Sequence, residues 1–412
     1  MMKKTAFISF IFFVLFASCE KNTDQPYILK FYGDAYEDIG YSVTIVSDGY
    51  VIAGQFTDIK RKDNIIDNLL SNKNMAIIKV GWDGNVIWKV NTGGKYDDWG
   101  SKITQLADGS LICVGTFTDT TTATPVQTDV FVVKVSATGE IIWQKAYGGP
   151  GNQTGKDIIK TPDGFMVLGS TNVERQPLTD STGNIEGNTD IFLLKINDNG
   201  DRVESFATGF PGNDLGSVIK IDNGGDFIVL GTTDRSDPGQ DKNNLILVKI
   251  NSVGYAVESK IIGGLKDEYA ADMEVLEDGY FIAGTVIKDN GDGEVFVTKL
   301  KNDIYAIPYF SNTLTITDPG SAGNSAGVYA VTKYGNSSFL LAGYTGKGAS
   351  TRFLVSEIDA EGNLVEGHQM IKGSKGSEVA YDVDSGDDEY IIAVGKNSYD
   401  VNSMITFLKF RF

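Results

Sequence analysis

An acidic residue followed two positions later by glycine or alanine recurs along this 412-residue chain. Seven positions are equivalent, and Gln153 and Ser325 occupy the two that are not acidic. The five acidic ones are Asp38, Asp98, Asp214, Glu268 and Glu378. Carboxylates gathered in a ring could bind a cation or a polar ligand. The alternative is that each carboxylate accepts backbone N–H bonds and holds its own turn in place.

Two of these acids are followed directly by an aromatic residue, Trp99 and Tyr269. A flat apolar ring beside a polar acceptor suits a sugar ring or the side chains of a protein partner. Ile39, Leu215 and Val379 occupy the same position in other copies, so both rings could instead pack as core. The seven candidate ligand-binding residues are Asp38, Asp98, Trp99, Asp214, Glu268, Tyr269 and Glu378.

Histidine and cysteine are too scarce for most other site chemistry. The chain has one histidine, His368, which falls in the outermost strand of a repeat, where we expect an exposed position. Cys113 stands between two apolar residues and is expected in the core. Two acidic clusters suggest calcium, but neither has the spacing of a twelve-residue calcium loop, and turns need the same residues. The clusters are Asp289, Asp292 and Glu294, and Asp382, Asp384 and Asp388. We expect no bound metal.

The elements that would position these residues come from one pattern that recurs seven times. Its clearest copy, residues 103–149, contains four strands, the first two joined by an Asp-Gly turn. A glycine closes the second strand of every copy, and the third strand carries a lysine, or Glu357 in the sixth copy. The glycines are Gly54, Gly115, Gly169, Gly231, Gly284, Gly343 and Gly395, and the lysines are Lys79, Lys134, Lys195, Lys249, Lys299 and Lys409. Repeats of this size predict an all-β protein, a seven-bladed β-propeller with four-stranded blades.

The ends of the chain favour a closed ring over an open solenoid. The seventh copy stops at Phe412 after its third strand, and residues 28–33 form a spare strand at the front. In a ring this N-terminal strand completes the last blade, whereas a solenoid would leave two open sheet edges. We therefore predict a closed, monomeric propeller over residues 27–412.

One face of the ring should be more elaborate than the other. The connections from second to third strand are longest in the first four copies. Antiparallel alternation places them on the face that carries the acidic positions, here called the elaborated face, and places the Asp-Gly turns on the opposite face. Loops on a rigid scaffold are where function usually lies. We expect ligands to bind there.

The first residues have the pattern of a targeting signal. Lys3 and Lys4 precede an apolar segment, residues 6–17, that is shorter than the roughly 20 residues a membrane-spanning helix needs. This pattern predicts a signal peptide over residues 1–18. Residues 16–19 resemble a bacterial lipobox, with phenylalanine where leucine is usual. The resemblance implies acylation of Cys19 and a short tether over residues 19–26, and ordinary secretion is the alternative.

The repeat itself resembles the seven-bladed propeller repeats of bacterial secreted and surface proteins. Its motifs are Gly-Gly before acid-x-Gly, then Asp-Gly, Gly-Thr and a strand such as "TDVFVVKV", and the sixth copy lacks the Asp-Gly turn. The resemblance implies a fold and an extracytoplasmic location, but no single activity. A weaker likeness to the docking motif of quinoprotein dehydrogenases fits only at Trp88 and Trp143, so we expect no cofactor.

These observations predict a lipid-anchored, non-catalytic propeller of the bacterial outer membrane that binds an envelope glycan or protein. Whether it faces the periplasm or the outside stays open. The net charge of -18 would repel a polyanion, so we expect no nucleic acid. The alternative function is a glycoside hydrolase or lyase, which would need two carboxylates roughly 5 to 10 Å apart in a closed pocket.

Overall fold

The computed structural model describes residues 27–412 apart from short segments. These segments are residues 34–36, 59–60, 63–64, 67–71, 120–126, 150, 173–175, 178–188, 211, 235–241, 252–253, 255, 317, 319–324, 349, 374–375, 387–388 and 400–401. The predicted signal peptide, Cys19 and the tether lie outside the described residues. Within the described part of the chain, no helix is long and apolar enough to cross a membrane.

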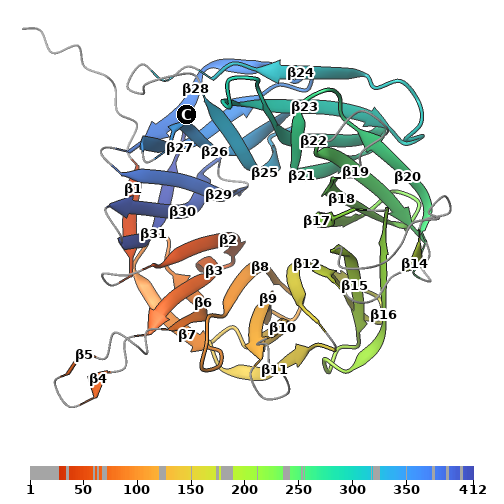
Figure 1. Cartoon of the computed structure of the whole chain (residues 1–412). Coiled ribbons are helices and arrows are strands. Elements are labelled where there is room, and N and C mark those ends of the chain that lie inside the picture. The colour runs from red at the N-terminus through yellow and green to blue at the C-terminus, as the bar shows by residue number, and fades with distance from the viewer. Residues whose placement is uncertain are drawn as a thin grey trace, which may run out of the picture.

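Seven four-stranded antiparallel sheets surround a central opening, which confirms the predicted seven-bladed β-propeller (Figure 1). The inner strands are β2 (Ile39–Val46), β8 (Trp99–Gln105), β12 (Gln153–Thr161), β17 (Asp214–Ile221), β21 (Asp267–Leu276), β25 (Ala326–Tyr334) and β29 (Ser377–Ser385). The second strands are β3 (Gly49–Asp58), β9 (Leu111–Asp119), β13 (Gly164–Thr171), β18 (Phe227–Thr233), β22 (Gly279–Ile287), β26 (Ser338–Lys347) and β30 (Ile391–Tyr399).

The outer half of each blade consists of a third and a fourth strand. The third strands are β6 (Asn72–Val80), β10 (Gln127–Val135), β15 (Asp190–Ile196), β19 (Asn244–Ile250), β23 (Gly293–Lys301), β27 (Ser350–Ile358) and β31 (Asn402–Phe410). The fourth strands are β7 (Val86–Thr92), β11 (Ile141–Tyr147), β16 (Arg202–Gly209), β20 (Ala256–Ile262), β24 (Phe310–Leu314), β28 (Leu364–Lys372) and β1 (Ile28–Tyr32). Three two-residue strands complete the set, β4 (Arg61–Lys62) paired with β5 (Ile65–Ile66), and β14 (Gln176–Pro177) beside β16.

The N-terminal strand closes the ring as predicted. β1 pairs antiparallel with β31, from Ile28 opposite Lys409 to Tyr32 opposite Ile405. Seven apolar clusters lie between neighbouring blades, and one of them joins the seventh blade to the first. The core is therefore continuous around the whole ring, with no open edge at the seventh blade.

The recurring glycine of the second strand allows a close approach to the inner strand. A Cβ added at Gly115 would lie 1.8 Å from the carbonyl oxygen of Trp99, so no side chain fits there. In every blade this glycine pairs with a residue of the inner strand. The next residue of the inner strand forms a β-bulge. The bulged residues are Tyr41, Ser101, Lys156, Ser217, Ala271, Tyr329 and Tyr381, and all seven line the central channel.

In the first, second, third and fifth blades the recurring lysine of the third strand pairs with the aspartate of the Asp-Gly turn, and in the fourth blade Lys249 pairs with Asp222. Lys79 lies 2.7 Å from Asp48, and Lys299 lies 2.8 Å from Asp278. In the sixth blade, which lacks both partners, Glu357 instead contacts His368 at 2.6 Å. This internal pairing explains why the two sequence features recur together.

Aromatic residues of the fourth strands pack on the turn of the next blade. Trp88 lies against Gly139 and Trp143 against Gly200, where an added Cβ would come within 3 Å of each ring. Both glycines also have φ values that favour glycine, +87° and +74°. The two tryptophans that resembled a quinoprotein motif are thus contacts between blades.

The sixth blade differs from the sequence alignment by one residue. Its ladder pairs Ala326 with Thr345 and Val328 with Gly343. The position equivalent to Asp214, which pairs with Thr233, is therefore Ala326, and the predicted assignment of Ser325 was wrong. The cause is that the segment before the bulge of the sixth blade is shifted by one residue relative to the other blades. The pattern of glycines did not reveal this shift.

Candidate functional site

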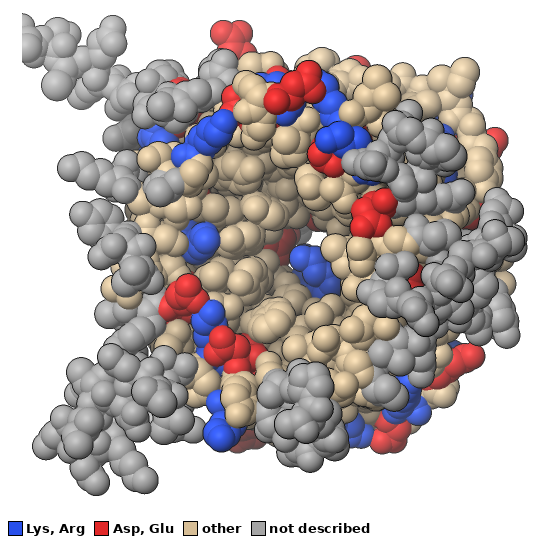
Figure 2. Space-filling model, in the orientation of Figure 1, with Lys and Arg blue, Asp and Glu red and all other residues tan. Residues whose placement is uncertain are grey.

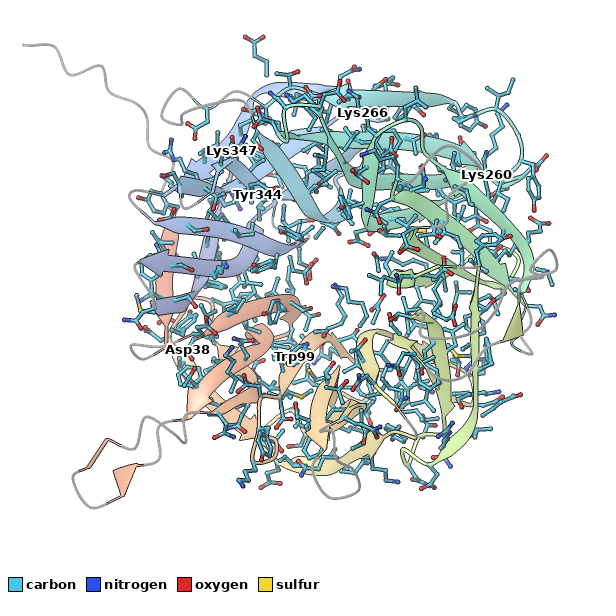
Figure 3. The ribbon with its side chains drawn as sticks, viewed as in Figure 1. Asp38, Trp99, Lys260, Lys266, Tyr344 and Lys347 are labelled. Atoms are coloured by element: carbon cyan, nitrogen blue, oxygen red, sulfur yellow. The ribbon has the colours of Figure 1, made fainter. Side chains whose placement is uncertain are left out.

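The five predicted carboxylates lie where inner strands begin, on the elaborated face, and we call them the latch ring. Asp38, Asp98, Asp214 and Glu378 are buried, and Glu268 is half-buried. The latch ring comprises Asp38, Asp98, Asp214, Glu268 and Glu378. Figure 3 labels Asp38 on the first blade.

Carboxylates of the latch ring accept hydrogen bonds from backbone N–H groups of the second strand of their own blade or of the connection that leads into it. Thr57 donates to Asp38 Oδ1 at 2.7 Å, Thr118 donates to Asp98 Oδ1 at 2.7 Å, and Phe210 donates to Asp214 Oδ2 at 2.6 Å. Burial raises the pKa of Asp98 to about 6, although N–H bonds from Gly94 and Thr118 oppose the shift. These contacts hold the turns in place, and ligand binding by the latch ring stays a prediction.

The two predicted aromatic residues line a cavity of about 850 Å³ at the elaborated end of the channel, here called the mouth. Trp99 is half-buried and Tyr269 is 43% exposed, so neither ring is fully enclosed in the core. Asn243 Nδ2 donates to the Tyr269 hydroxyl at 3.1 Å. A volume of this size lies within the roughly 300 to 1,000 Å³ of typical ligand pockets.

A row of tyrosines that sequence reasoning missed forms the other side of the mouth. Ring centroids are 5.3 Å apart for Tyr41 and Tyr381, 4.9 Å for Tyr381 and Tyr329, and 6.1 Å for Tyr329 and Tyr344. Trp99 and Tyr344 lie on opposite sides of the central opening (Figure 3). Burial raises the pKa of Tyr41 to about 12, which keeps its hydroxyl neutral.

Uncharged polar groups complete the mouth. They are Ser101, Thr116, Thr154, Ser170, Thr189, Asn213, Ser217, Thr232 and Asn243. Among the described residues that line this cavity, Asp234 is the one acid and Lys156 the one base. Asp234 is engaged by the side-chain amide of Asn213, with a distance of 2.6 Å between Nδ2 and Oδ2. Amides, hydroxyls and aromatic faces are the groups that recognise an uncharged polar ligand.

A second cavity of about 320 Å³ continues into the channel, and its described lining includes five carboxylates, Asp157, Asp272, Glu274, Asp382 and Asp384. Asp157, Asp272 and Asp382 come directly after the bulges of the third, fifth and seventh blades, and we call them the channel ring. Each accepts a bond from an inner strand of the next blade, from Ile219 N at 3.0 Å, Val331 N at 3.2 Å and Val43 N at 2.9 Å respectively. The channel ring therefore joins neighbouring blades.

Three lysines share the channel with these acids. Lys102 Nζ lies 3.2 Å from Asp382, and Lys220 Nζ lies 3.6 Å from Glu274. Burial lowers the pKa of Lys102, but attraction by Asp382 and its neighbours outweighs this, so the pKa is raised overall. For Lys156 burial prevails, and its pKa is lowered. Figure 2 shows basic atoms beside the central opening, surrounded mainly by uncharged side chains.

The remaining predicted residues have local roles. Cys113 is buried in the core, and His368 stacks on Phe412 at 5.0 Å. Asp292 pairs with Lys347 at 2.8 Å, and Glu294 pairs with Lys288 at 3.1 Å. No group of three or more His, Cys, Asp or Glu side chains within the described segments is arranged to hold a metal ion. Asp382 and Asp384 line the channel, while Asp388 lies outside the described residues.

Comparison with known proteins gives similarity of fold. No family model and no curated protein matches the sequence. Raptor from Chaetomium thermophilum is similar at 8% identity and a TM-score of 0.54, over 93% of this chain and only 29% of the Raptor chain. The Pan2 WD40 domain of Neurospora crassa is similar at 9% identity and a TM-score of 0.47, over 92% of this chain and 97% of that domain. An α-L-arabinanase of Penicillium chrysogenum, complexed with arabinobiose, is similar at 13% identity and a TM-score of 0.47, over 75% of this chain and 92% of the arabinanase chain. At identities this low, the similarity concerns the fold alone and carries no function over to this chain.

Proposed function

We propose that this chain is a non-catalytic binding propeller that holds a glycan at the mouth. The observation that carries the proposal is the composition of the 850 Å³ cavity, in which aromatic faces alternate with neutral amides and hydroxyls. Trp99 and Tyr269 offer rings for the apolar face of a sugar, and Thr154, Ser170 and Thr189 offer hydroxyls for its polar groups. The tyrosine row extends this surface for a second sugar unit.

The charge distribution favours binding over hydrolysis. A glycosidase of the usual kind flanks the scissile bond with two carboxyl groups. The described part of the mouth contributes a single acid, Asp234, which Asn213 already engages. Each carboxylate of the channel ring is occupied by backbone N–H groups. Carboxylate-dependent hydrolysis or lysis therefore remains the second candidate.

The location is proposed from the sequence. A signal peptide followed by Cys19 supports a lipid anchor in the envelope of a bacterium, with the propeller held outside the cytoplasm. Replacing Cys19 by alanine should release the protein from the membrane fraction. An unchanged membrane fraction would contradict the lipid anchor and leave the binding proposal intact.

The binding proposal is tested on a glycan array with the purified protein, followed by calorimetry on the strongest ligand. Alanine at Trp99 or Tyr269 should weaken binding by roughly tenfold or more, because each removes an aromatic contact. The matched control is Tyr305→Ala, since Tyr305 is 63% exposed but does not line the mouth. Loss of affinity in the control alone would place the site elsewhere, turnover of the glycan would favour the enzyme, and capture of proteins without glycans would favour a protein partner.

A further inference from the structure

Lys156 occupies the boundary between the mouth and the channel. It is the bulged residue of β12, and it lines both the 850 Å³ and the 320 Å³ cavities. Its side chain is open to the water of the channel but has protein on all sides. A ligand that fills the mouth would therefore meet this ammonium group at the bottom of its site.

The other two channel lysines form ion pairs, whereas Lys156 forms none with the residues that the structure describes. Lys102 pairs with Asp382, and Lys220 pairs with Glu274. In the described part of the chain, no hydrogen bond or ion pair of Lys156 is formed. Burial lowers the pKa of Lys156, and attraction by Asp157, Asp272 and Asp382 opposes that shift without a direct contact. An incoming anion would supply the missing partner.

The channel ring determines how far such an anion can enter. Beyond Lys156, acids outnumber bases in the described lining of the channel. The acids are Asp157, Asp272, Glu274, Asp382 and Asp384, and the bases are Lys102 and Lys220. An anionic group would be repelled below the level of Lys156 and attracted at that level. The uncharged, aromatic mouth above would then hold the rest of the ligand.

We infer that the glycan bound at the mouth is acidic, and that its anionic group pairs with the ammonium of Lys156. This inference rests on the proposed function and names the chemical class of its ligand. The anionic group is a carboxylate, as in a uronic acid, or a sulfate ester, since both accept charge-assisted hydrogen bonds from an ammonium. Such a bond strengthens binding by about tenfold to a hundredfold over the uncharged parent sugar.

Calorimetry on matched ligands tests the inference. The panel contains oligosaccharides with a single uronate, oligosaccharides with a single sulfate ester and their uncharged parents, all titrated at pH 7. We expect the wild type to bind an acidic member at least tenfold more tightly than its neutral parent, and which acidic member binds identifies carboxylate or sulfate. Lys156→Met should remove this preference without weakening the neutral parent, and Lys156→Arg should retain it.

Lys266→Met is the matched control, because it removes the same charge from the connection between β20 and β21 without touching either cavity. Circular dichroism and thermal unfolding check that both methionine variants are folded. Equal affinity of the wild type for acidic and neutral members, or a preference that persists in Lys156→Met, would overturn the inference and leave glycan binding standing. A wild type that binds no glycan of the panel would overturn the proposed function itself.

Discussion

The latch ring and the channel ring both consist of carboxylates along the inner strands, and β21 and β29 carry one of each, yet the two rings have different roles. Glu268 and Asp272 are four residues apart on one strand, and so are Glu378 and Asp382. Latch carboxylates bond to N–H groups of their own blade and of the connection that leads into it, as Asp98 does with Thr118 and Gly94. Channel carboxylates bond to the next blade, as Asp382 does with Val43.

The rings also differ in their counter-charges. Asp98 is buried beside another acid, Asp97, and its pKa rises to about 6. Asp382 has Lys102 within 3.2 Å. A buried carboxylate is costly unless it is paired, so the two rings should respond differently to mutation and to pH. The latch ring stabilises single blades, and the channel ring stabilises the contacts between blades.

The largest effect is expected from Asp382→Ala in the channel ring. This change removes the acceptor of the Val43 and Val383 N–H groups and leaves Lys102 without its partner. We expect a loss of about 3 to 5 kcal/mol in the free energy of unfolding, measured by urea denaturation. Ser42→Ala is the neutral control at the equivalent position, where only one N–H bond from Ile103 is lost. Equal losses for the two variants would show that the ion pair contributes nothing.

The second effect is a pH dependence specific to the latch ring. Asp98 has a pKa of about 6 in the folded protein against 3.8 as its ordinary value, so the folded state binds the proton more tightly. Its contribution to stability is therefore present at low pH and is lost as the pH rises from about 4 to 6. Relative to Asp98→Asn, the wild type should gain up to about 3 kcal/mol between pH 7 and pH 4. Thermal unfolding of both proteins at each pH gives this difference, and parallel curves would contradict it.

Removing the Asp98 side chain altogether should have an intermediate effect. Asp98→Ala leaves the N–H groups of Gly94 and Thr118 without their acceptor, but it removes no ion-pair partner from a lysine. We expect a loss of about 2 kcal/mol in the free energy of unfolding at pH 7, since part of the lost bonding is offset by removal of a buried charge. A loss as large as that of Asp382→Ala would erase the distinction between the rings.

The smallest effect is expected on the opposite face. Lys299 pairs with Asp278 of an Asp-Gly turn, and Asp278 is about half exposed. Lys299→Met should cost less than about 1 kcal/mol, because water and salt screen such pairs. Urea denaturation at low and high salt measures the change. A larger cost would mean that the ion pairs of the Asp-Gly turns stabilise the fold as much as the carboxylates of the two rings do.

The fold was predictable because its sequence pattern recurs seven times. The Asp-Gly turns, the strand-closing glycines and the spare strand at residues 28–33 together specified blades and closure. The sixth blade, which lacks the Asp-Gly turn, is where the alignment slipped by one residue at Ala326. Strand positions are predicted best in the copies whose sequences are most alike.

The candidate site was only partly predictable for a related reason. Trp99 and Tyr269 were found because they adjoin a recurring acid. The tyrosine row and Lys156 were missed, because each inner strand has a bulge and the alternation of facing residues changes there. The channel ring was missed as well, since its acids occupy only three of seven equivalent positions and do not form a motif. Charge partners and cavities depend on neighbours from other blades, which a single repeat does not contain.

Closure of the seventh blade by β1 has a consequence for how the chain can fold. The first six blades each take all four strands from one continuous stretch, so they can form in order as the chain grows. The seventh needs the first strand and the last strand together, and that contact has the largest sequence separation in the molecule. Ring closure must therefore wait until β31 has been synthesised. Until then β1 and the growing edge are both exposed, and a chain released early would be a template for aggregation.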